Sequence, residues 1–214
     1  MPTPTSSDTI KGLDVYHGDD ITSFANLLSG GSEFIAAKAT QGTSFEDPNY
    51  ASTKAGAKAA GMVFGAYHFV DLSVDGATQA DFFANYVNAN GGLQEGDFAM
   101  FDWETSSGDP YSSHDGTTIQ NFLNEIKVKL KRRCFVYVSP DLVDATGNPS
   151  YLSEYPLWIA DYNSSPAVPA PWKTWNVWQT TGSASIYGLG NQGDADIFKG
   201  SLDDLKTLIK YTEL

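Results

Sequence analysis

Short apolar segments with the β-branched and aromatic composition of β-strands recur along the whole chain, and helical patterns separate the early ones. Because strand and helix alternate, the sequence predicts an α/β fold built on a parallel sheet. The expected strands are Gly12–Tyr16, Phe34–Lys38, Met62–Phe69, Phe98–Glu104, Cys134–Val138, Leu157–Asp161, Asn176–Gln179 and Asp194–Phe198. The expected helices are Ile21–Leu28, Asn49–Ala60, Thr78–Asn88, Thr118–Lys131 and Leu202–Tyr211.

The pattern changes after the fifth expected strand, because the later connections cannot hold full helices. Asp141–Ala145 is long enough for about one helical turn, and Asn163–Trp172 contains three prolines, which interrupt a regular helix. Residues 182–193 are rich in glycine and serine and are expected to be a loop. The sequence therefore predicts an irregular (β/α) barrel of eight strands whose last crossovers lack full helices. We expect a flexible leader at residues 1–9 and a single catalytic domain over residues 10–214.

The composition supports a buried core and excludes several classes of protein. Hydrophobic residues make up 41% of the chain and charged residues 18%, which excludes a disordered chain. A net charge of −13 would repel nucleic acid, so no nucleic-acid partner is expected. No apolar run is long enough to span a bilayer. Cys134 is the single cysteine, which excludes an intrachain disulfide and a thiolate metal cluster.

The segment Phe101–Glu104 places two carboxyl groups at the end of a strand. In a parallel barrel the carboxyl ends of the strands form the rim at which catalytic residues gather. Asp102 and Glu104 are two residues apart, so they share one side of the strand, with Cβ atoms about 7 Å apart. Two carboxyl groups this close disfavour double ionisation, so one pKa should rise and that group could act as a general acid. The alternative is a pair of solvated acids at an exposed strand end.

Other acids are candidates for the same rim. Asp14 lies in an otherwise apolar strand, and because burial of an unpaired carboxylate is costly, it should face the barrel mouth or have a partner. Its alternative role is to cap the next helix. Asp194 and Asp196 lie in the last expected strand, and either could reach the rim or form a local turn.

Aromatic residues gather at the ends of the same strands, where their faces could stack on sugar rings and their polar tips could form hydrogen bonds. These aromatic residues are Tyr16, Tyr67, Phe69, Trp103, Tyr137, Trp158, Tyr162 and Trp178. Some of the eight are expected to pack in the core instead of contacting a ligand. The histidines lack metal-ligand spacing, and alternation with Tyr67 turns His68 to the opposite side of its strand. The sequence contains no motif for a nucleophilic triad or for nucleotide binding. Catalysis by carboxyl groups is therefore the mechanism that the sequence still allows.

Seven segments together resemble glycoside hydrolase family 25, the N-acetylmuramidase lysozymes. They occur in the family's order and cover nearly the whole chain. They are Gly12–Val15, Phe34–Thr40, Gly65–Phe69, Phe101–Glu104, Leu157–Ala160, Trp178–Gln179 and Gly193–Phe198. The resemblance implies an irregular barrel that cleaves the β-1,4 bond between N-acetylmuramic acid and N-acetylglucosamine in peptidoglycan, with no metal or other cofactor.

The resemblance also implies roles for individual residues. By position, Glu104 is similar to the family's general acid, and Asp102 to the carboxylate that stabilises the attacking 2-acetamido group or the oxocarbenium centre. Asp14 and Asp194 match the remaining acidic positions, with Asp194 chosen over Asp196 by counting back from Phe198. The expected substrate-binding residues are Tyr67, Tyr137, Trp158, Tyr162 and Gln179.

The expected partner is bacterial peptidoglycan, and the protein is expected to be a monomer. Secretion is inferred from that substrate alone. The first residues lack the charged and apolar regions of a signal peptide and so give no separate indication of it. The spacing of Asp102 and Glu104 leaves little room for an attacking water on the far face of the sugar, so we expect retention of configuration through the substrate's own acetamido group.

Three alternatives stay open. The first is a chitinase-like barrel of glycoside hydrolase family 18, although Met100 stands where that family has a further aspartate. The second is a metal-dependent hydrolase with Asp14, Asp102, Glu104 and His68 as ligands. The third is a catalytically silent sugar-binding barrel, which would need the aromatic residues but not the acids.

Overall fold

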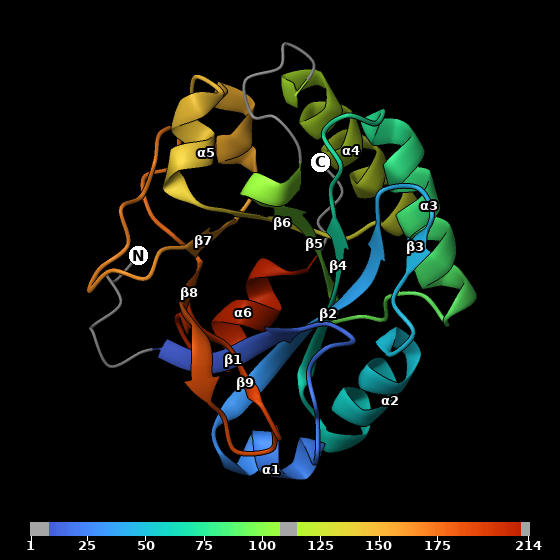
Figure 1. Ribbon diagram of the computed structural model, residues 1–214, viewed down its shortest axis with the longest axis vertical. Helices are drawn as coiled ribbons and strands as arrows, with labels where there is room; N and C mark the ends of the chain where they lie inside the picture. Colours follow the sequence, from blue (N-terminus) through green and yellow to red (C-terminus); the bar gives the residue numbers. More distant parts are fainter. Residues whose placement is uncertain (1–8, 108–114, 211–214) are drawn as a thin grey trace.

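The computed structural model describes residues 9–107 and 115–210 and arranges their strands as a ring (Figure 1). The strands are β1 (Thr9–Val15), β2 (Ser32–Gln41), β3 (Phe45–Glu46), β4 (Val63–Phe69), β5 (Phe98–Trp103), β6 (Cys134–Val138), β7 (Leu157–Ala160), β8 (Val177–Ser185) and β9 (Gln192–Lys199). The helices are α1 (Phe24–Ser29), α2 (Tyr50–Ala60), α3 (Gly76–Ala89), α4 (Asp115–Leu130), α5 (Pro140–Ala145) and α6 (Leu202–Leu208), with 3₁₀ turns η1 (Thr105–Ser107) and η2 (Ser150–Glu154).

Within the described ranges, eight strands close the barrel, because β1 pairs with β2 on one side and with β9 on the other. Neighbouring strands are parallel from β1 to β8, and the short β3 lies antiparallel on the outer edge of β2. β9 runs antiparallel to both β8 and β1. The predicted irregular eight-stranded barrel is confirmed. The expectation of a wholly parallel sheet is wrong at its last strand.

The last two strands form a hairpin that the sequence did not reveal. Residues 182–193 were expected to be a loop, yet β8 continues to Ser185 and β9 begins at Gln192. Antiparallel strands need only a short connection, so no crossover helix is required here. The far half of the hairpin is mostly exposed, so its glycine and serine residues carry no hydrophobic alternation to mark a strand.

Local sequence signals account for several of the described helix ends. Asp75 caps α3 by accepting a hydrogen bond from the Thr78 backbone N–H at 2.8 Å. Ser201 and Asp204 form a reciprocal capping box at the start of α6. Gly61 ends α2 with a φ of 84°, a left-handed conformation that glycine adopts without a Cβ clash.

Inward side chains fill the barrel as an apolar floor beneath its mouth. Gly12 and Gly65 make this packing possible, since a Cβ at Gly12 would lie 2.4 Å from the Phe34 ring and one at Gly65 would lie 2.2 Å from the Phe98 ring. The apolar members of this inner cluster include Ile10, Phe34, Val63, Phe98, Met100, Phe135, Trp158, Val177 and Phe198.

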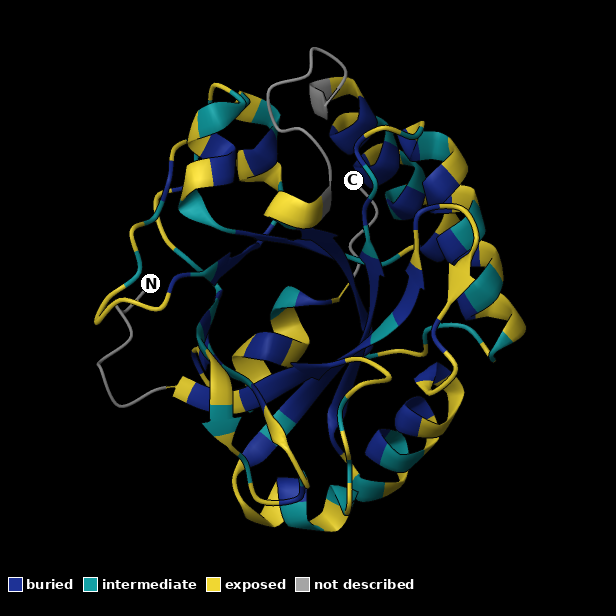
Figure 2. Cartoon of the chain, in the orientation of Figure 1, coloured by how far each residue is buried: buried dark blue, intermediate teal, exposed yellow. Residues whose placement is uncertain are grey.

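Helix α6 covers the floor, because its Leu205 and Ile209 belong to the same inner cluster. Figure 1 shows α6 behind the centre of the ring of strands. The expected helix Leu202–Tyr211 therefore exists but ends at Leu208, and its last expected residue lies outside the described residues. The helices α1 to α4 pack outside the strands, with buried inner faces and exposed outer faces (Figure 2).

The termini bear on two expectations. Of the expected leader at residues 1–9, Thr9 is the first residue of β1 and the others lie outside the described residues. In the part of the chain that the structure describes, no helix combines the length and hydropathy needed to cross a bilayer.

Candidate active site

The mouth of the barrel is polar because four neighbouring strands each change from an apolar to a polar inward residue over the same distance. In each of these strands, the residue four positions after an apolar residue of the inner cluster is polar. Residues four positions apart in a strand point to the same side, so both side chains point into the barrel. The pairs are Ile10 with Asp14 in β1, Phe34 with Lys38 in β2, Val63 with Tyr67 in β4, and Phe98 with Asp102 in β5. The strands therefore bring Asp14, Tyr67 and Asp102 together at one end of the barrel, as expected from the sequence.

Gln179, in β8, links three of the expected residues. Its Nε2 donates to Asp14 Oδ2 at 2.8 Å, and its Oε1 accepts from the hydroxyls of Tyr137 at 2.9 Å and Tyr162 at 2.7 Å. The amide is 1% exposed. Because both ends of the amide are in use, its orientation is fixed, and it holds the Asp14 carboxyl and the two phenols in one arrangement.

β9 runs antiparallel to its neighbours, so its acidic residues come before its floor residue in the sequence rather than after it. Phe198 lies in the floor and Asp194 lies four residues before it, so the antiparallel course of β9 carries Asp194 up to the mouth. Asp194 is partly exposed, whereas Asp196 is buried one step deeper and accepts from Trp158 Nε1 at 2.9 Å. Asp194 is thus the one of the two that a ligand in the mouth can contact.

The pKa values of the three acids of β1 and β9 are all raised. Burial, and then the charges of Asp196 and Asp194, raise the pKa of Asp14 well above its usual range, although the Gln179 hydrogen bond opposes the rise. Burial raises the pKa of Asp194 to about 6 and that of Asp196 to about 8, against hydrogen bonds with Asp14. A pKa of about 8 keeps Asp196 mostly protonated at neutral pH.

Asp102 and Glu104 form the second acidic group. Asp102 is buried, and its Oδ1 has no hydrogen-bond partner among the residues that the structure describes. Burial and then the Glu104 charge raise the pKa of Asp102 well above its usual range. Burial also raises the pKa of Glu104, while Lys38 and a hydrogen bond with Ser106 act in the opposite direction. A half-buried carboxyl with a raised pKa is suited to donate a proton near neutral pH.

Lys38 is a residue of this site that sequence reasoning missed. Its Nζ lies 4.5 Å from the centre of the Phe69 ring and 5.7 Å from that of Phe45, and it donates to Gln41 Oε1 at 2.7 Å. Burial lowers the pKa of Lys38, while the charges of Asp102, Asp47 and Glu104 oppose that change. The signal that could have revealed it was an inward lysine at the end of an apolar strand, opposite in charge to the acids of the neighbouring strands.

Two residues considered for the site lie away from its surface. Trp158 is fully buried beneath the mouth and packs against the rings of Phe34, Phe98 and Phe135, so it supports the site from inside the barrel. His68 points outward from β4 and stacks on Phe122, with burial lowering its pKa to about 4. In the described ranges, no group of three histidine, cysteine or carboxyl side chains is arranged to hold a metal ion.

Two clefts open beside η1. One, of about 440 Å³, is lined by Glu104, Tyr137, Tyr162 and Asp161. The other, of about 400 Å³, is lined by Ser106 together with residues that follow β2 and β4. The mouth thus combines a proton donor, ionisable carboxyls and aromatic surface between two clefts, which suits acid-catalysed cleavage of a chain-like substrate that crosses the rim.

Comparisons with known proteins agree on one family. The sequence model described as "Glycosyl hydrolases family 25" matches residues 13–189. The chain is similar to the N,O-diacetylmuramidase of Arthroderma benhamiae, with 31% identity over 218 residues that cover 96% of this chain and 89% of the relative. It is also 28% identical to Lysozyme M1 of Streptomyces globisporus, over 98% of this chain and 74% of that protein.

Solved structures show the same fold. The bacterial lysozyme from Streptomyces coelicolor superposes with a TM-score of 0.85 at 27% identity, covering 93% of this chain and 96% of that one. The family GH25 lysozyme from Aspergillus fumigatus gives a TM-score of 0.82 at 30% identity, covering 94% of this chain and 98% of that one.

The first prediction concerns Lys38. Lys38→Met should raise the pKa of both Asp102 and Glu104, because the ammonium charge lowers both. Carbon-13 NMR titration of the two carboxyl groups measures the change. Lys38→Arg keeps the positive charge, so its two pKa values should stay close to those of the wild type. Lys199→Met is the matched control, since Lys199 also lies over an aromatic ring, that of Trp175, but outside the mouth. Unchanged titration curves in Lys38→Met would show that the charge does not act on these acids.

The second prediction concerns the stability cost of the buried acids. A folded-state pKa of about 8 for Asp196, above its ordinary value of 3.8, means that stability is lost as pH rises from about 4 to about 8. Asp196→Asn keeps an acceptor for the Trp158 indole and should be more stable than the wild type at pH 8, by about 2 kcal/mol or more, since one pKa unit corresponds to about 1.4 kcal/mol.

Urea unfolding at pH 4 and pH 8 measures this difference. Asp203→Asn, at an exposed position of α6, is the control for removing a carboxyl group elsewhere. Equal pH dependence in Asp196→Asn and the wild type would contradict the assignment of the cost to Asp196.

Proposed function

The chain belongs to glycosyl hydrolases family 25, and we propose that it hydrolyses the β-1,4 bond between N-acetylmuramic acid and N-acetylglucosamine in bacterial peptidoglycan. It is a glycoside hydrolase of the lysozyme type. The observation that carries the proposal is the joint position of Asp102 and Glu104 at the end of β5, in a mouth where burial raises the pKa of both. Hydrolysis of purified peptidoglycan, with and without a chelator, tests it.

Glu104 is proposed as the general acid. Glu104 lines the cleft of about 440 Å³ that it shares with Tyr137 and Tyr162. Its half-buried position raises its pKa, so that it can carry a proton to the leaving oxygen. Its hydrogen bond with Ser106 fixes the carboxyl relative to η1. Departure of the leaving sugar then leaves positive charge on the ring that remains in the mouth.

Asp102 is proposed to stabilise that charge without attacking it. Its Oδ1 lacks a partner among the described residues, so the N–H of the substrate's 2-acetamido group can supply the missing donor. Held this way, the acetamido oxygen is directed at the anomeric carbon and closes a cyclic cation, which water then opens. The Lys38 charge opposes the rise in the pKa of Asp102 and so acts in favour of the ionised carboxylate that this role requires.

The remaining residues are proposed to shape the pocket for the ring. Asp14, fixed by Gln179, and the partly exposed Asp194 offer acceptors or donors to its hydroxyls. Tyr67 and Tyr137 are buried against the mouth, while Tyr162 is 62% exposed and can cover a bound sugar. Trp158 acts from below, through Asp196.

We propose residues 10–214 as one catalytic domain that acts as a monomer on cell walls outside the cell. The external location follows from the substrate, and acidic overall charge is compatible with a site that contacts the uncharged glycan backbone.

The third prediction tests the acid. Glu104→Gln should fold and bind substrate as the wild type does but lose turnover by about 10²–10⁴-fold, because an amide N–H is too weakly acidic to protonate the leaving oxygen. Release of reducing ends from purified peptidoglycan measures turnover. Glu95→Gln, at an exposed position, is the control and should keep full activity. A Glu104→Gln enzyme with a tenth of normal activity would mean that another group is the acid.

The fourth prediction concerns stereochemistry. Acetamido assistance inverts the anomeric centre twice, so the first product should keep the β configuration. Proton NMR of a defined peptidoglycan fragment, recorded during the first turnovers, distinguishes the anomers. A substrate analogue with a hydroxyl in place of the 2-acetamido group should lose most of its reactivity. An α-anomer as the first product, or a trapped sugar ester on Asp102, would exclude this mechanism.

A further inference from the structure

The basic residues of the chain are gathered at the end of the barrel opposite the mouth. This is the floor end, where the parallel strands begin and α6 covers the core. All of the chain's 13 lysine and arginine residues except Lys38 lie at the floor end or in helices that run down to it. They are Lys11, Lys54, Lys58, Lys127, Lys129, Lys131, Arg132, Arg133, Lys173, Lys199, Lys206 and Lys210.

A cleft of about 380 Å³ opens at the floor end. It lies where three neighbouring strands begin, because Arg133, Pro156 and Asn176 line it and directly precede β6, β7 and β8. Lys173, from the loop before β8, and Leu208, from α6, also line it. The length of the strands therefore separates this cleft from the catalytic carboxyls.

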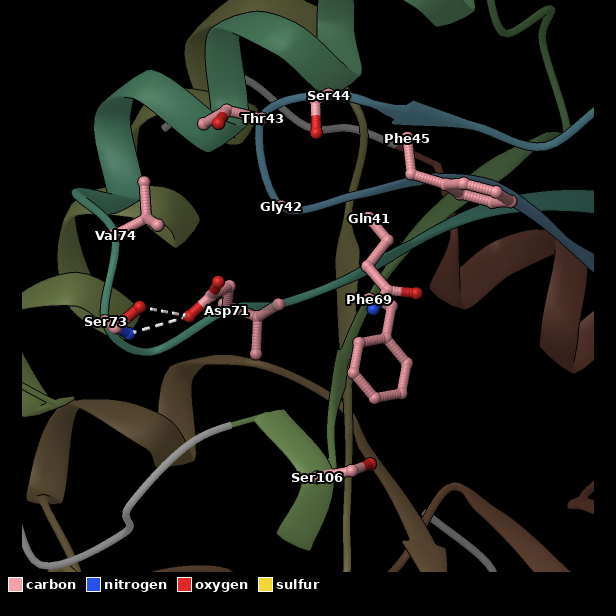
Figure 3. Close-up of a pocket in the computed structure, with 11 residues that line it drawn as sticks. Gln41, Gly42, Thr43, Ser44, Phe45, Phe69, Asp71, Ser73, Val74 and Ser106 are labelled. Atoms are coloured by element: carbon pink, nitrogen blue, oxygen red, sulfur yellow. Dashed lines mark hydrogen bonds between the residues drawn. The ribbon is translucent and has the colours of Figure 1, made fainter.

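The lining of the floor cleft differs in charge from the linings of the two clefts beside η1. Among the described residues, the cleft of about 440 Å³ is lined by three acids and by no lysine or arginine. The cleft of about 400 Å³, shown in Figure 3, contains Asp71 and again no cationic side chain. The floor cleft is lined by Arg133 and Lys173 and by one acid, the exposed Glu154. An anionic ligand is therefore favoured at the floor cleft and repelled at the mouth.

The donors of the floor cleft are not used by the protein itself. In the described ranges, neither the Arg133 guanidinium nor the Lys173 ammonium forms a hydrogen bond or an ion pair. Asn176 Oδ1 accepts from the Leu157 N–H at 3.0 Å, and the Nδ2 of the same amide has no acceptor among these residues. A half-buried guanidinium has five N–H groups to satisfy, and an oxyanion in the cleft would supply the acceptors.

The walls that carry these donors are held in place. Trp172 Nε1 donates to the Tyr155 carbonyl at 2.8 Å, which ties the loop before β8 to the residue after η2. The Lys199 backbone N–H donates to the Asn176 carbonyl at 2.9 Å, and its Nζ donates to Thr174 Oγ1 at 2.9 Å. Because Thr174 lines the cleft, Lys199 adds a third positive charge at its edge.

The net charge of −13 does not prevent an anion from binding at this end. β4 has seven residues, and at about 3.3 Å a residue it spans about 20 Å. Exposed charges more than about 10 Å apart are largely screened at about 0.1 M salt. The acids of the mouth therefore act weakly on a ligand at the floor end, where the cations are gathered.

We propose that the floor cleft binds a phosphate group of an anionic polymer with polyol units, through Arg133 and Lys173. Bound in this way, the protein would hold its mouth away from the polyanion and toward neutral glycan. The proposal adds a second binding site to the proposed function, and its first test needs no enzymatic activity.

The lining favours this ligand over a carboxylate polymer and over nucleic acid. Arg133 comes from one chain segment, and Lys173 and Asn176 come from another, so their donors can reach different oxygens of a tetrahedral phosphate. Pro171 offers apolar surface to the CH groups of a polyol. Trp172 is buried, and the described lining has no exposed aromatic ring on which a nucleobase could stack.

Binding of the phosphate group is tested by NMR with glycerol 3-phosphate. The ligand should shift the amide signals of residues 153–155 and 172–176, and glycerol alone should not. Arg133→Gln and Lys173→Gln should each weaken binding about 10-fold, as expected for the loss of a charge-assisted hydrogen bond. Lys173 is exposed, so its variant decides the matter if Arg133→Gln does not fold.

Lys206→Gln is the matched control for these variants. It removes the same charge from an exposed position of α6 outside the cleft, and it should bind glycerol 3-phosphate as the wild type does. Absence of shifts in the wild type overturns the proposal. Equal weakening in Lys206→Gln and in the two cleft variants also overturns it, because the effect would then be one of overall charge.

Binding of the polymer is tested with poly(glycerol phosphate) by calorimetry at several salt concentrations. Affinity should fall as salt rises, and Arg133→Gln should reduce that dependence because fewer counterions are released. Poly-L-glutamate and a single-stranded DNA oligonucleotide should each bind at least about 10-fold more weakly. Equal affinity for either one would assign the cleft to carboxylate polymers or to nucleic acid and would contradict the proposal.

Hydrolysis of cell walls shows whether the site matters to the enzyme. On walls that carry a phosphodiester polymer, Arg133→Gln and Lys173→Gln should lower the rate about 3- to 10-fold, because the second contact raises the effective concentration of enzyme at the wall. On peptidoglycan from which that polymer has been removed, both variants should match the wild type. Equal losses on both substrates would contradict the proposal. If the wild type cleaves neither substrate, the proposed function fails, and the binding measurements still decide the floor cleft.

Discussion

The chemistry of this protein depends on one geometrical constraint, that every strand of a closed barrel must send alternate side chains inward. Along β1, β2, β4 and β5, the inward series begins with a large apolar residue in the floor and reaches a polar one in the mouth four residues later. A shift of one residue in β5 would turn Phe98 and Asp102 outward together. The register that buries the core is therefore the same register that aims the carboxyl group.

The reversed direction of β9 extends this constraint to the far side of the mouth. If β9 were parallel to its neighbours, Asp194 would enter at the floor and Phe198 would reach the mouth. Sequence patterns predicted the strand and its acids, and the resemblance selected Asp194, but neither indicated the direction of the strand. That direction depends on the hairpin at residues 182–193, whose glycine and serine residues carry no hydrophobic alternation. Strand pairing, which is a long-range interaction, decided what local composition could not.

The same distinction explains which site residues the sequence could reveal. Asp14, Asp102 and Glu104 were identifiable because carboxyl groups are rare in or at the end of apolar strands. Lys38 was not, because its significance comes from its charge beside Asp102 and Glu104, which are distant in the chain. Trp158 illustrates the opposite case: its position on β7 was correct, but only depth in the barrel distinguishes an aromatic residue that can touch a ligand from one that supports the floor.

The buried acids of the mouth are accommodated mainly by raised pKa values rather than by ion pairs with cations. Burial raises the pKa values of Asp14, Asp102 and Asp196, and the charges of neighbouring acids add to the rise. Lys38 is the cation that acts on Asp102 and Glu104, and it is held by the two aromatic rings that line the cleft shown in Figure 3. The position of these rings therefore fixes the one cation that lowers the pKa of both Asp102 and Glu104 among the described residues.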